Sequence, residues 1–363
     1  MKYTEINNKI DSVDMENPYS LDSETKSSFL LEMLSNISTY HEKNSPGYKN
    51  FLKVFKEKEN FKNLEDIPPL PVRAFKMHDL YSVDSKSIIK TLTSSGTTGQ
   101  KVSKIYLDKN TARRQSKALT NITKDFIGKS RMPMIIIDSS DVIKDRTKLN
   151  ARAAGILGYS IFGRDHFYCL DNDLRLLLAD LKEYIRKHEN KPILVFGFTY
   201  IVWQAIQSIK DEKNRIKFPE GSILIHGGGW KKLADQNISN KIFKSEISKN
   251  LNIKKIYNYY GMVEQVGSIF MECEEGYLHC PNYADIIIRN PENLEKLDNN
   301  IEGVIQVLSI LPVSYPGHSL LTEDLGTIIG EDDCACGRKG KYFQVSGRMP
   351  MAELRGCSDT RKT

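Results

Sequence analysis

The sequence contains no apolar run that approaches the roughly 20 residues needed by a membrane-spanning helix. Its opening residues, MKYTEINNKIDSVDMENPYS, also lack the apolar core of a secretion signal. We therefore expect a cytoplasmic protein without a membrane partner. In that reducing compartment the six cysteines are expected to be free, metal-bound or catalytic rather than joined in disulfide bonds.

Dense blocks of one charge are missing as well. The 363 residues carry a net charge of +6, and the lysines are scattered along the chain. This pattern is typical of a solvated surface and argues against nucleic-acid binding, while an anionic substrate or an acidic partner stays compatible with it. With 40% hydrophobic and 27% charged residues, the composition is that of a soluble globular protein.

Two common nucleotide-binding motifs are absent: a Walker loop, in which Lys directly follows the second Gly, and a G-x-G-x-x-G dinucleotide motif. Instead, TSSGTTGQKV occupies residues 93–102, after a β-prone run. Its glycines and hydroxyls would expose many donors to the oxygens of a polyphosphate, with Lys101 as a cation at the rim. An ordinary flexible connector is the alternative. We predict that the loop binds ATP through Thr93, Ser94, Ser95, Gly96, Thr97, Thr98 and Gly99.

After this loop, short apolar runs alternate with helical patterns. The apolar runs lie at residues 134–137, 159–162, 193–196, 222–225 and 255–257, and the helical patterns at 109–127, 171–188, 199–211 and 231–249. This alternation predicts an α/β fold with parallel βαβ units and ligand sites at the carboxyl ends of the strands.

The two ends of the chain have other patterns. Residues 22–58 carry a helical apolar stripe, and from residue 268 short β-prone runs follow one another with little helix between them. We therefore predict a helical lead-in at 1–65, an α/β core at 66–267, and a smaller β-rich subdomain at 268–363.

Glycines and a tyrosine-rich motif follow two of the expected strands. Gly227, Gly228 and Gly229 come after SILIH and allow a flat ligand to approach the backbone, with a strand-to-helix turn as the alternative. In the following YYGMVE, Tyr260 is expected to stack on adenine. Glu264 is expected to hold Mg²⁺, which prefers oxygen ligands and shares them with phosphates. An aromatic-rich strand end is the alternative.

Two further residues could complete a nucleotide site. Asp324, in TEDLG, could accept hydrogen bonds from both ribose hydroxyls, although a β-turn would account for this motif as well. Arg348, in a Gly-Arg pair, is suited to ribose and phosphate oxygens, with a surface arginine as the alternative.

Four potential metal ligands lie in two tight clusters. Cys273 and His279 form a C-x5-H pair, and Cys334 and Cys336 form a C-x-C pair downstream. Thiolates and imidazole suit Zn²⁺, so these residues predict a closed, structural zinc site. Cys280 competes with His279 for the fourth position, and buried free cysteines are the alternative to any metal.

The order of the motifs is that of the N-terminal domain of adenylate-forming enzymes, which make an acyl-AMP from ATP and a carboxylic acid. More narrowly, IPPLPVRAFK, ILIHGGGW and SYPGHSLLTEDLG resemble the acyl-protein synthetases of bacterial luminescence, the LuxE family, from residue 65 onward. The resemblance implies activation of a fatty acid with ATP. It also implies acyl transfer to a cysteine near the C-terminus, here Cys357, and from there to a reductase.

The resemblance leaves several points open. Only a short tail follows Arg348, where full-length adenylate-forming ligases carry a second domain with a catalytic lysine, and LuxE-like proteins share this truncation. Lys101 or a partner protein is then expected to balance the phosphate charge. Coenzyme A or a carrier protein is an alternative acyl acceptor. The alternative interpretation of Cys357 is a cysteine without a function in a disordered terminus. Rival functions are an acyl–CoA ligase of the phenylacetate type and a non-catalytic acyl- or nucleotide-binding subunit of a reductase complex.

Overall fold

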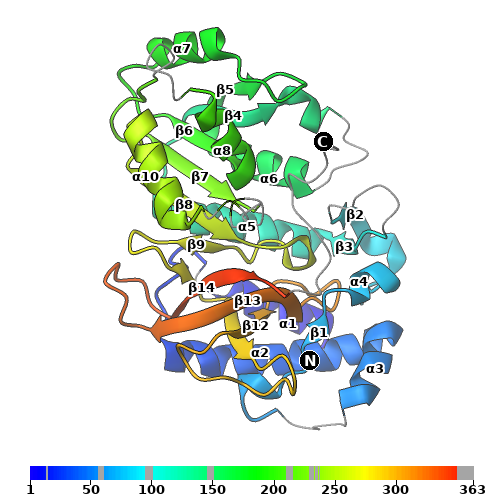
Figure 1. Cartoon of the computed structure of the whole chain (residues 1–363). Helices are drawn as coiled ribbons and strands as arrows, with labels where there is room; N and C mark the ends of the chain where they lie inside the picture. The colour runs from blue at the N-terminus through cyan, green and yellow to red at the C-terminus, as the bar shows by residue number, and fades with distance from the viewer. Residues whose placement is uncertain are drawn as a thin grey trace. The chain divides into compact units, whose positions relative to one another are not determined.

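The computed structural model describes residues 1–13, 15–55, 61–94, 101–144, 151–209, 216–228, 233, 236 and 238–349. Figure 1 shows the elements along the chain, which divides into two compact units. Unit 1 comprises residues 1–94, 99–126 and 261–353, and unit 2 comprises residues 95–98, 127–260 and 354–363.

Unit 2 is built on five parallel strands. They are β4 (Met132–Ser139), β5 (Gly163–Leu170), β6 (Leu194–Phe198), β7 (Ile223–Gly227) and β8 (Lys255–Tyr260), in the order β5-β4-β6-β7-β8. Every residue of β4, β6 and β7 is buried, as expected of inner strands in a parallel sheet. The helices between the strands are α6 (Ala151–Ser160), α7 (Leu178–Lys187), α8 (Thr199–Gln207) and α10 (Asn240–Leu251).

Two elements of unit 2 differ from the sequence prediction. The apolar run at 159–162, predicted as a strand, begins inside α6, and the strand is β5. Tyr159 is buried because it stacks on Phe196 at 4.6 Å between ring centroids. The helix predicted at 171–188 begins only at Leu178, because the Asp171 carboxylate accepts hydrogen bonds from downstream amides and holds a turn there.

Unit 1 is built on an antiparallel sheet. Its strands are β9 (Phe270–Glu272), β10 (Leu278–His279), β11 (Ala284–Arg289), β12 (Gly303–Ser309), β13 (Ser319–Glu331) and β14 (Lys341–Arg348), in the order β11-β12-β13-β14-β10-β9. The short β1 (Leu70–Pro71) runs parallel to β13. A separate antiparallel pair, β2 (Ile88–Thr93) and β3 (Lys104–Asp108), forms the stem of the predicted phosphate loop.

Helices complete unit 1: α1 (Tyr3–Asp11), α2 (Ser23–Asn44), α3 (Pro46–Leu52), α4 (Ala74–Met77) and α5 (Lys109–Ile127). Asp22 is the N-cap of α2, and its carboxylate accepts a hydrogen bond from the Thr25 amide at 2.8 Å. The helical pattern predicted at 22–58 is interrupted because Pro46 cannot continue a helix and starts α3 instead. No helix among the described residues is long and apolar enough to cross a membrane.

The mixed α/β architecture confirms the predicted fold class. Each of the two units is made of separate stretches of the chain, whereas the sequence predicted three consecutive segments. The N-terminal residues belong with the C-terminal strands because β1 pairs with β13 and because the Leu21 amide donates a hydrogen bond to Asn282 at 3.1 Å.

Candidate functional site

The stem of the predicted phosphate loop is closed by two serines of unit 1. The Ser94 amide donates to the Ser103 carbonyl at 3.1 Å, and the Ser103 amide donates to Ser94 Oγ at 2.9 Å. These bonds extend the β2–β3 pairing, whose last register partners are Thr93 and Lys104. Ser95, Gly96, Thr97, Thr98 and Gly99 lie outside the described residues, and Lys101, at the end of the loop, is exposed.

The predicted magnesium ligand, Glu264, is attached to this stem. It lies in a single 3-10 turn at Val263–Gln265 and is buried, with 4% of its surface exposed. The Ser103 hydroxyl donates a hydrogen bond to Glu264 Oε1 at 2.7 Å. The structure therefore connects the loop stem to the carboxylate through a residue that the sequence motifs did not include. The signal in the sequence is that Ser94 and Ser103 stand on either side of the loop.

The two predicted ribose ligands face each other on adjacent strands. Asp324 of β13 and Arg348 of β14 are register partners, and Arg348 Nε lies 3.1 Å from Asp324 Oδ1. The buried Thr322 hydroxyl accepts a hydrogen bond from the Asp324 amide at 3.1 Å and donates one to the Ile305 carbonyl at 2.7 Å. This arrangement holds the carboxylate in place before any ligand arrives.

The remaining predicted nucleotide ligands belong to unit 2. Gly227 ends β7, and Gly228 follows with a φ of +64°, which favours glycine. Gly229 lies outside the described residues. At the end of β8, Tyr260 is half-buried, whereas its neighbour Tyr259 packs directly against Gly227. A Cβ at Gly227 would lie 2.5 Å from the Tyr259 ring, so this close approach requires glycine.

The four predicted zinc ligands, Cys273, His279, Cys334 and Cys336, come together in unit 1 and are referred to as the Cys/His cluster. Their ligand atoms all lie within 4.8 Å of one another. Cys273 Sγ is 3.9 Å from Cys334 Sγ, and Cys336 Sγ is 3.3 Å from His279 Nε2. In a tetrahedral site with zinc–sulfur bonds of about 2.3 Å, neighbouring ligand atoms lie about 3.8 Å apart. The residues present therefore fit a zinc ion.

The protonation of the cluster agrees with this fit. Burial lowers the pKa of His279 to about 4, so its imidazole is neutral and can act as a ligand. His279 Nδ1 is buried and has no hydrogen-bond partner among the described residues. Burial raises the pKa of the Cys273 thiol to about 12, and a bound cation would counteract this by stabilising the thiolate.

Two other cysteines lie apart from the cluster. Cys280 is buried and does not belong to the cluster. Burial is the main reason why the pKa of Cys280 is raised. Cys169 is buried in β5, and burial raises its pKa to about 12, which makes it a poor nucleophile. Cys357 lies outside the described residues.

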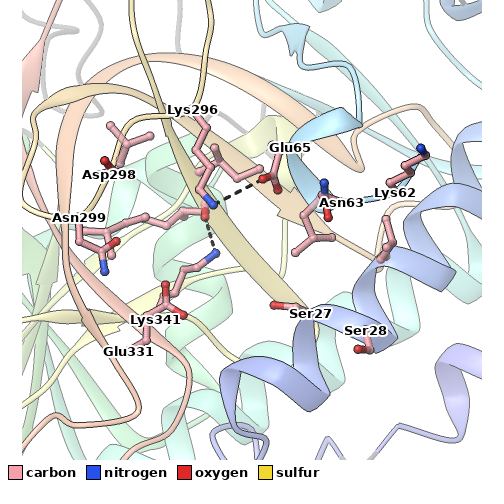
Figure 2. Close-up of a pocket in the computed structure, with 16 residues that line it drawn as sticks. Ser27, Ser28, Lys62, Asn63, Glu65, Lys296, Asp298, Asn299, Glu331 and Lys341 are labelled. Atoms are coloured by element: carbon pink, nitrogen blue, oxygen red, sulfur yellow. Dashed lines mark hydrogen bonds and ion pairs between the residues drawn. The ribbon is translucent and has the colours of Figure 1, made fainter. Parts of the chain in front are cut away.

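A cavity of about 710 Å³ in unit 1 contains none of the predicted site residues among the described residues that line it. Figure 2 shows it beside α2, with charged side chains around it. Lys296 pairs with Glu65 at 3.5 Å, and Lys341 donates to the Ile286 carbonyl at 3.3 Å. Because none of the described residues that line it is predicted for the reaction, we assign this cavity no part in it.

Comparison with protein families gives one match over nearly the whole chain. A family model described as acyl-protein synthetase, LuxE, matches residues 3–362. Two relatives are named long-chain-fatty-acid–luciferin-component ligase. The Vibrio harveyi protein is 23% identical over 329 residues, which are 88% of this chain and 83% of that protein. The Aliivibrio fischeri protein is 23% identical over 330 residues, which are 88% and 84% of the two chains.

Solved structures resemble the chain at lower sequence identity. An open conformation of 2-hydroxyisobutyryl-CoA ligase, in complex with 2-HIB-AMP and CoA, has a TM-score of 0.71 and 16% identity. The match covers 92% of this chain and 77% of that chain. The same ligase in its postadenylation state has a TM-score of 0.70 and 15% identity, with 92% and 70% covered. At this identity the likeness concerns the fold, and it agrees with the predicted one.

Proposed function

Since the chain belongs to the LuxE acyl-protein synthetase family, we propose that it activates a fatty acid with ATP and transfers the acyl group to a thiol. The names of the two luciferin-component ligases support a long-chain fatty acid as the substrate. The structural observation that carries the proposal is the buried Glu264 carboxylate, hydrogen-bonded to the stem of the loop with polyphosphate-binding composition.

We also propose a cytoplasmic location.

The reaction takes place in two steps. A carboxylate oxygen of the acid forms a bond to the α-phosphorus of ATP, and the bond to the bridging oxygen breaks, so pyrophosphate leaves. A thiolate sulfur then forms a bond to the acyl carbon of the adenylate, and AMP leaves with the electron pair of the broken C–O bond. Such chemistry requires accurate positioning and charge neutralisation more than covalent participation of side chains.

The residues of this chain would divide these tasks. The loop from Thr93 to Lys101 would hold the β- and γ-phosphates, and Asp324 with Arg348 would hold the ribose. Tyr260 and the glycines at 227–229 would contact the adenine. The carboxylate of Glu264 and the hydroxyls of the loop are oxygen donors of the kind that fit Mg²⁺. When bound, this ion would neutralise charge on the phosphates.

We propose that the Cys/His cluster holds a structural Zn²⁺ with no part in the reaction. A shell filled by four protein ligands leaves no open position for water or substrate. Cys273 follows β9, His279 belongs to β10, and the other two ligands lie between β13 and β14. The ion would therefore join two hairpins of the unit 1 sheet.

ATP–pyrophosphate exchange over a panel of fatty acids tests the activation step. We expect exchange with long-chain acids and its loss in Glu264→Gln, which removes the charge of the carboxylate. Glu331→Gln, on β13 at the cavity of Figure 2, is the matched control and should keep wild-type exchange. Absence of exchange with every acid would contradict the proposal and favour a non-catalytic subunit.

Mass spectrometry after incubation with ATP and acid distinguishes the possible acceptors. Acylation that disappears in Cys357→Ser would identify this cysteine as the acceptor. Acylation that persists would exclude it. Release of acyl-CoA on addition of coenzyme A would favour the CoA ligase, and transfer to an added reductase or carrier protein would identify a protein partner.

A further inference from the structure

We propose that Ser103 is a positioning residue that couples the phosphate loop to the magnesium-binding carboxylate of Glu264. The inference rests on the proposed function for the role of Glu264. Ser103 follows the loop and is separated from Glu264 by 161 positions in the sequence. Its side chain touches neither reacting group in the proposal, and it would act only through Glu264.

Ser103 takes part in two hydrogen-bond systems at once. Its backbone exchanges bonds with Ser94 across the loop stem, at 3.1 Å and 2.9 Å. Its hydroxyl donates to Glu264 Oε1 at 2.7 Å, and the residue has no exposed surface. A movement of the two strands of the stem would therefore shift Ser103 and, with it, the hydrogen bond to Glu264.

The backbone around Glu264 is fixed from another side. The Gln265 side chain donates to the Gly317 carbonyl at 2.9 Å. Gly317 also lies close to this backbone, because a Cβ added there would lie 2.8 Å from the Glu264 carbonyl oxygen. Within this backbone, the Ser103 hydroxyl fixes one oxygen of the carboxylate, Oε1, by donating a hydrogen bond to it.

This orientation decides how the carboxylate meets a cation. The Ser103 hydroxyl takes one lone pair of Oε1, and an ionised carboxylate offers about four such sites in all. A hydrogen bond to Oε1 restricts the rotation of the carboxylate group. Because Mg²⁺ demands near-octahedral geometry, a carboxylate that is free to rotate should bind the ion less well than one held in place.

Substitution of Ser103 combined with direct measurement of metal binding tests the inference. Mn²⁺ serves as the probe, and its binding to the protein is followed by electron paramagnetic resonance in the presence of ATP, against a matched Mn²⁺–ATP solution without protein. Ser103→Cys keeps nearly the same volume but is a weak donor, and Ser103→Ala removes the donor. We expect both to weaken Mn²⁺ binding about tenfold, which corresponds to the loss of one hydrogen bond to a charged group.

Two variants separate positioning from general stability. Ser38→Ala removes another buried hydroxyl of unit 1, which bonds to Tyr48 OH at 2.9 Å, and it should leave Mn²⁺ binding unchanged. Ser103→Thr keeps a donor and should restore most of the affinity. Equal Mn²⁺ binding in wild type and Ser103→Cys, or an equal loss in Ser38→Ala, would overturn the inference.

Pyrophosphate exchange measured on the same samples distinguishes the inference from the proposed function. If the wild type binds Mn²⁺ with ATP but exchanges with no acid, the proposed function fails, while the response of Ser103→Cys still decides the inference. If the wild type does not bind Mn²⁺ with ATP at all, both are overturned. In an active enzyme, the concentration of Mg²⁺ required for half-maximal exchange should rise with the same variants.

Discussion

Arg348 Nε lies 3.1 Å from Asp324 Oδ1, so two adjacent strands of unit 1 present a preformed ion pair. The two side chains keep 26% and 16% of their surface exposed, which leaves them accessible to a ligand. Partly exposed ion pairs contribute only about 0–1 kcal/mol to stability. The proposed role of this pair in ribose binding therefore predicts that its loss affects nucleotide affinity more than the stability of the fold.

Substitution of Asp324 should weaken ATP binding. In Asp324→Asn the side chain can no longer accept hydrogen bonds at both oxygens, so we expect the KM for ATP to rise about tenfold, as for the loss of one charge-assisted hydrogen bond. Steady-state exchange kinetics measure this. Glu323→Gln, which affects the neighbouring ion pair with Arg73, is the control and should keep the wild-type KM. If Asp324→Asn lowers the free energy of unfolding by more than it lowers the free energy of ATP binding, a binding role is contradicted.

Removal of a ligand from the Cys/His cluster should release zinc. We expect about one zinc ion per chain in gently purified protein and almost none in Cys273→Ser, because three remaining ligands hold the ion far less tightly. Metal analysis by mass spectrometry measures the content. Cys280→Ser is the matched control, since Cys280 lies next to His279 in sequence but outside the cluster. Wild-type protein without zinc would rule out the site.

Two buried histidines should make the protein sensitive to acid. His41 bonds to Ser82 Oγ at 2.7 Å and to the Pro312 carbonyl at 3.3 Å, and its ring lies 5.0 Å from that of His318. Burial lowers the pKa of His41 to about 3, and burial also lowers the pKa of His318 well below its usual 6.5. Below pH 6.5, these two histidines are therefore protonated in the unfolded chain but stay neutral in the folded chain.

The free energy of unfolding should accordingly be highest above pH 6.5 and fall as the pH is lowered toward 3. Each histidine contributes at most about 1.4 kcal/mol per pH unit in this range. His41→Gln should remove one such contribution, which urea unfolding between pH 7 and pH 5 can measure as a shallower slope. The exposed His78 provides the control, because His78→Gln should keep the wild-type slope. An unchanged slope in His41→Gln would contradict the assignment.

A side chain at Gly227 should disturb the end of β7. Its Cβ would meet the Tyr259 ring at 2.5 Å, so Gly227→Ala forces the ring or the strand to move, at a cost of about 1–3 kcal/mol. Thermal unfolding and the KM for ATP measure the effect. We expect a lower melting temperature and a higher KM. Gly347→Ala, with nothing within 4 Å of the added Cβ, should unfold like the wild type. Unchanged stability in Gly227→Ala would show that the ring moves freely.

The sequence predicted strands best where both faces are buried. The apolar run predicted at 193–196 overlaps β6, and every residue of that strand is buried. β5 was missed because its first half, Arg164 to His166, is polar and exposed, so it has no apolar signature. The preceding apolar run at 159–162 was too short to distinguish a helix end from a strand.

The candidate site shows the same limit of local patterns. Motifs and their order in the sequence singled out the loop, Glu264 and the two Cys/His groups as predicted site residues. The contact between Ser103 and Glu264 depends on tertiary folding, and neither neighbourhood in the sequence reveals it. The alternative between His279 and Cys280 was equally open, because the two are neighbours in the sequence and only the folded structure groups His279 with the three thiols.

The pairing of β1 with β13 has a consequence for synthesis of the chain. Leu70 is paired with Leu320, so when β1 leaves the ribosome its partner has not yet been translated. Residues 127–260, which form the parallel sheet, are contiguous and can fold as they emerge, as domains generally do during translation. β1 can pair only after β13 has been synthesised. A chain that ends before residue 319 would leave β1 without its partner strand.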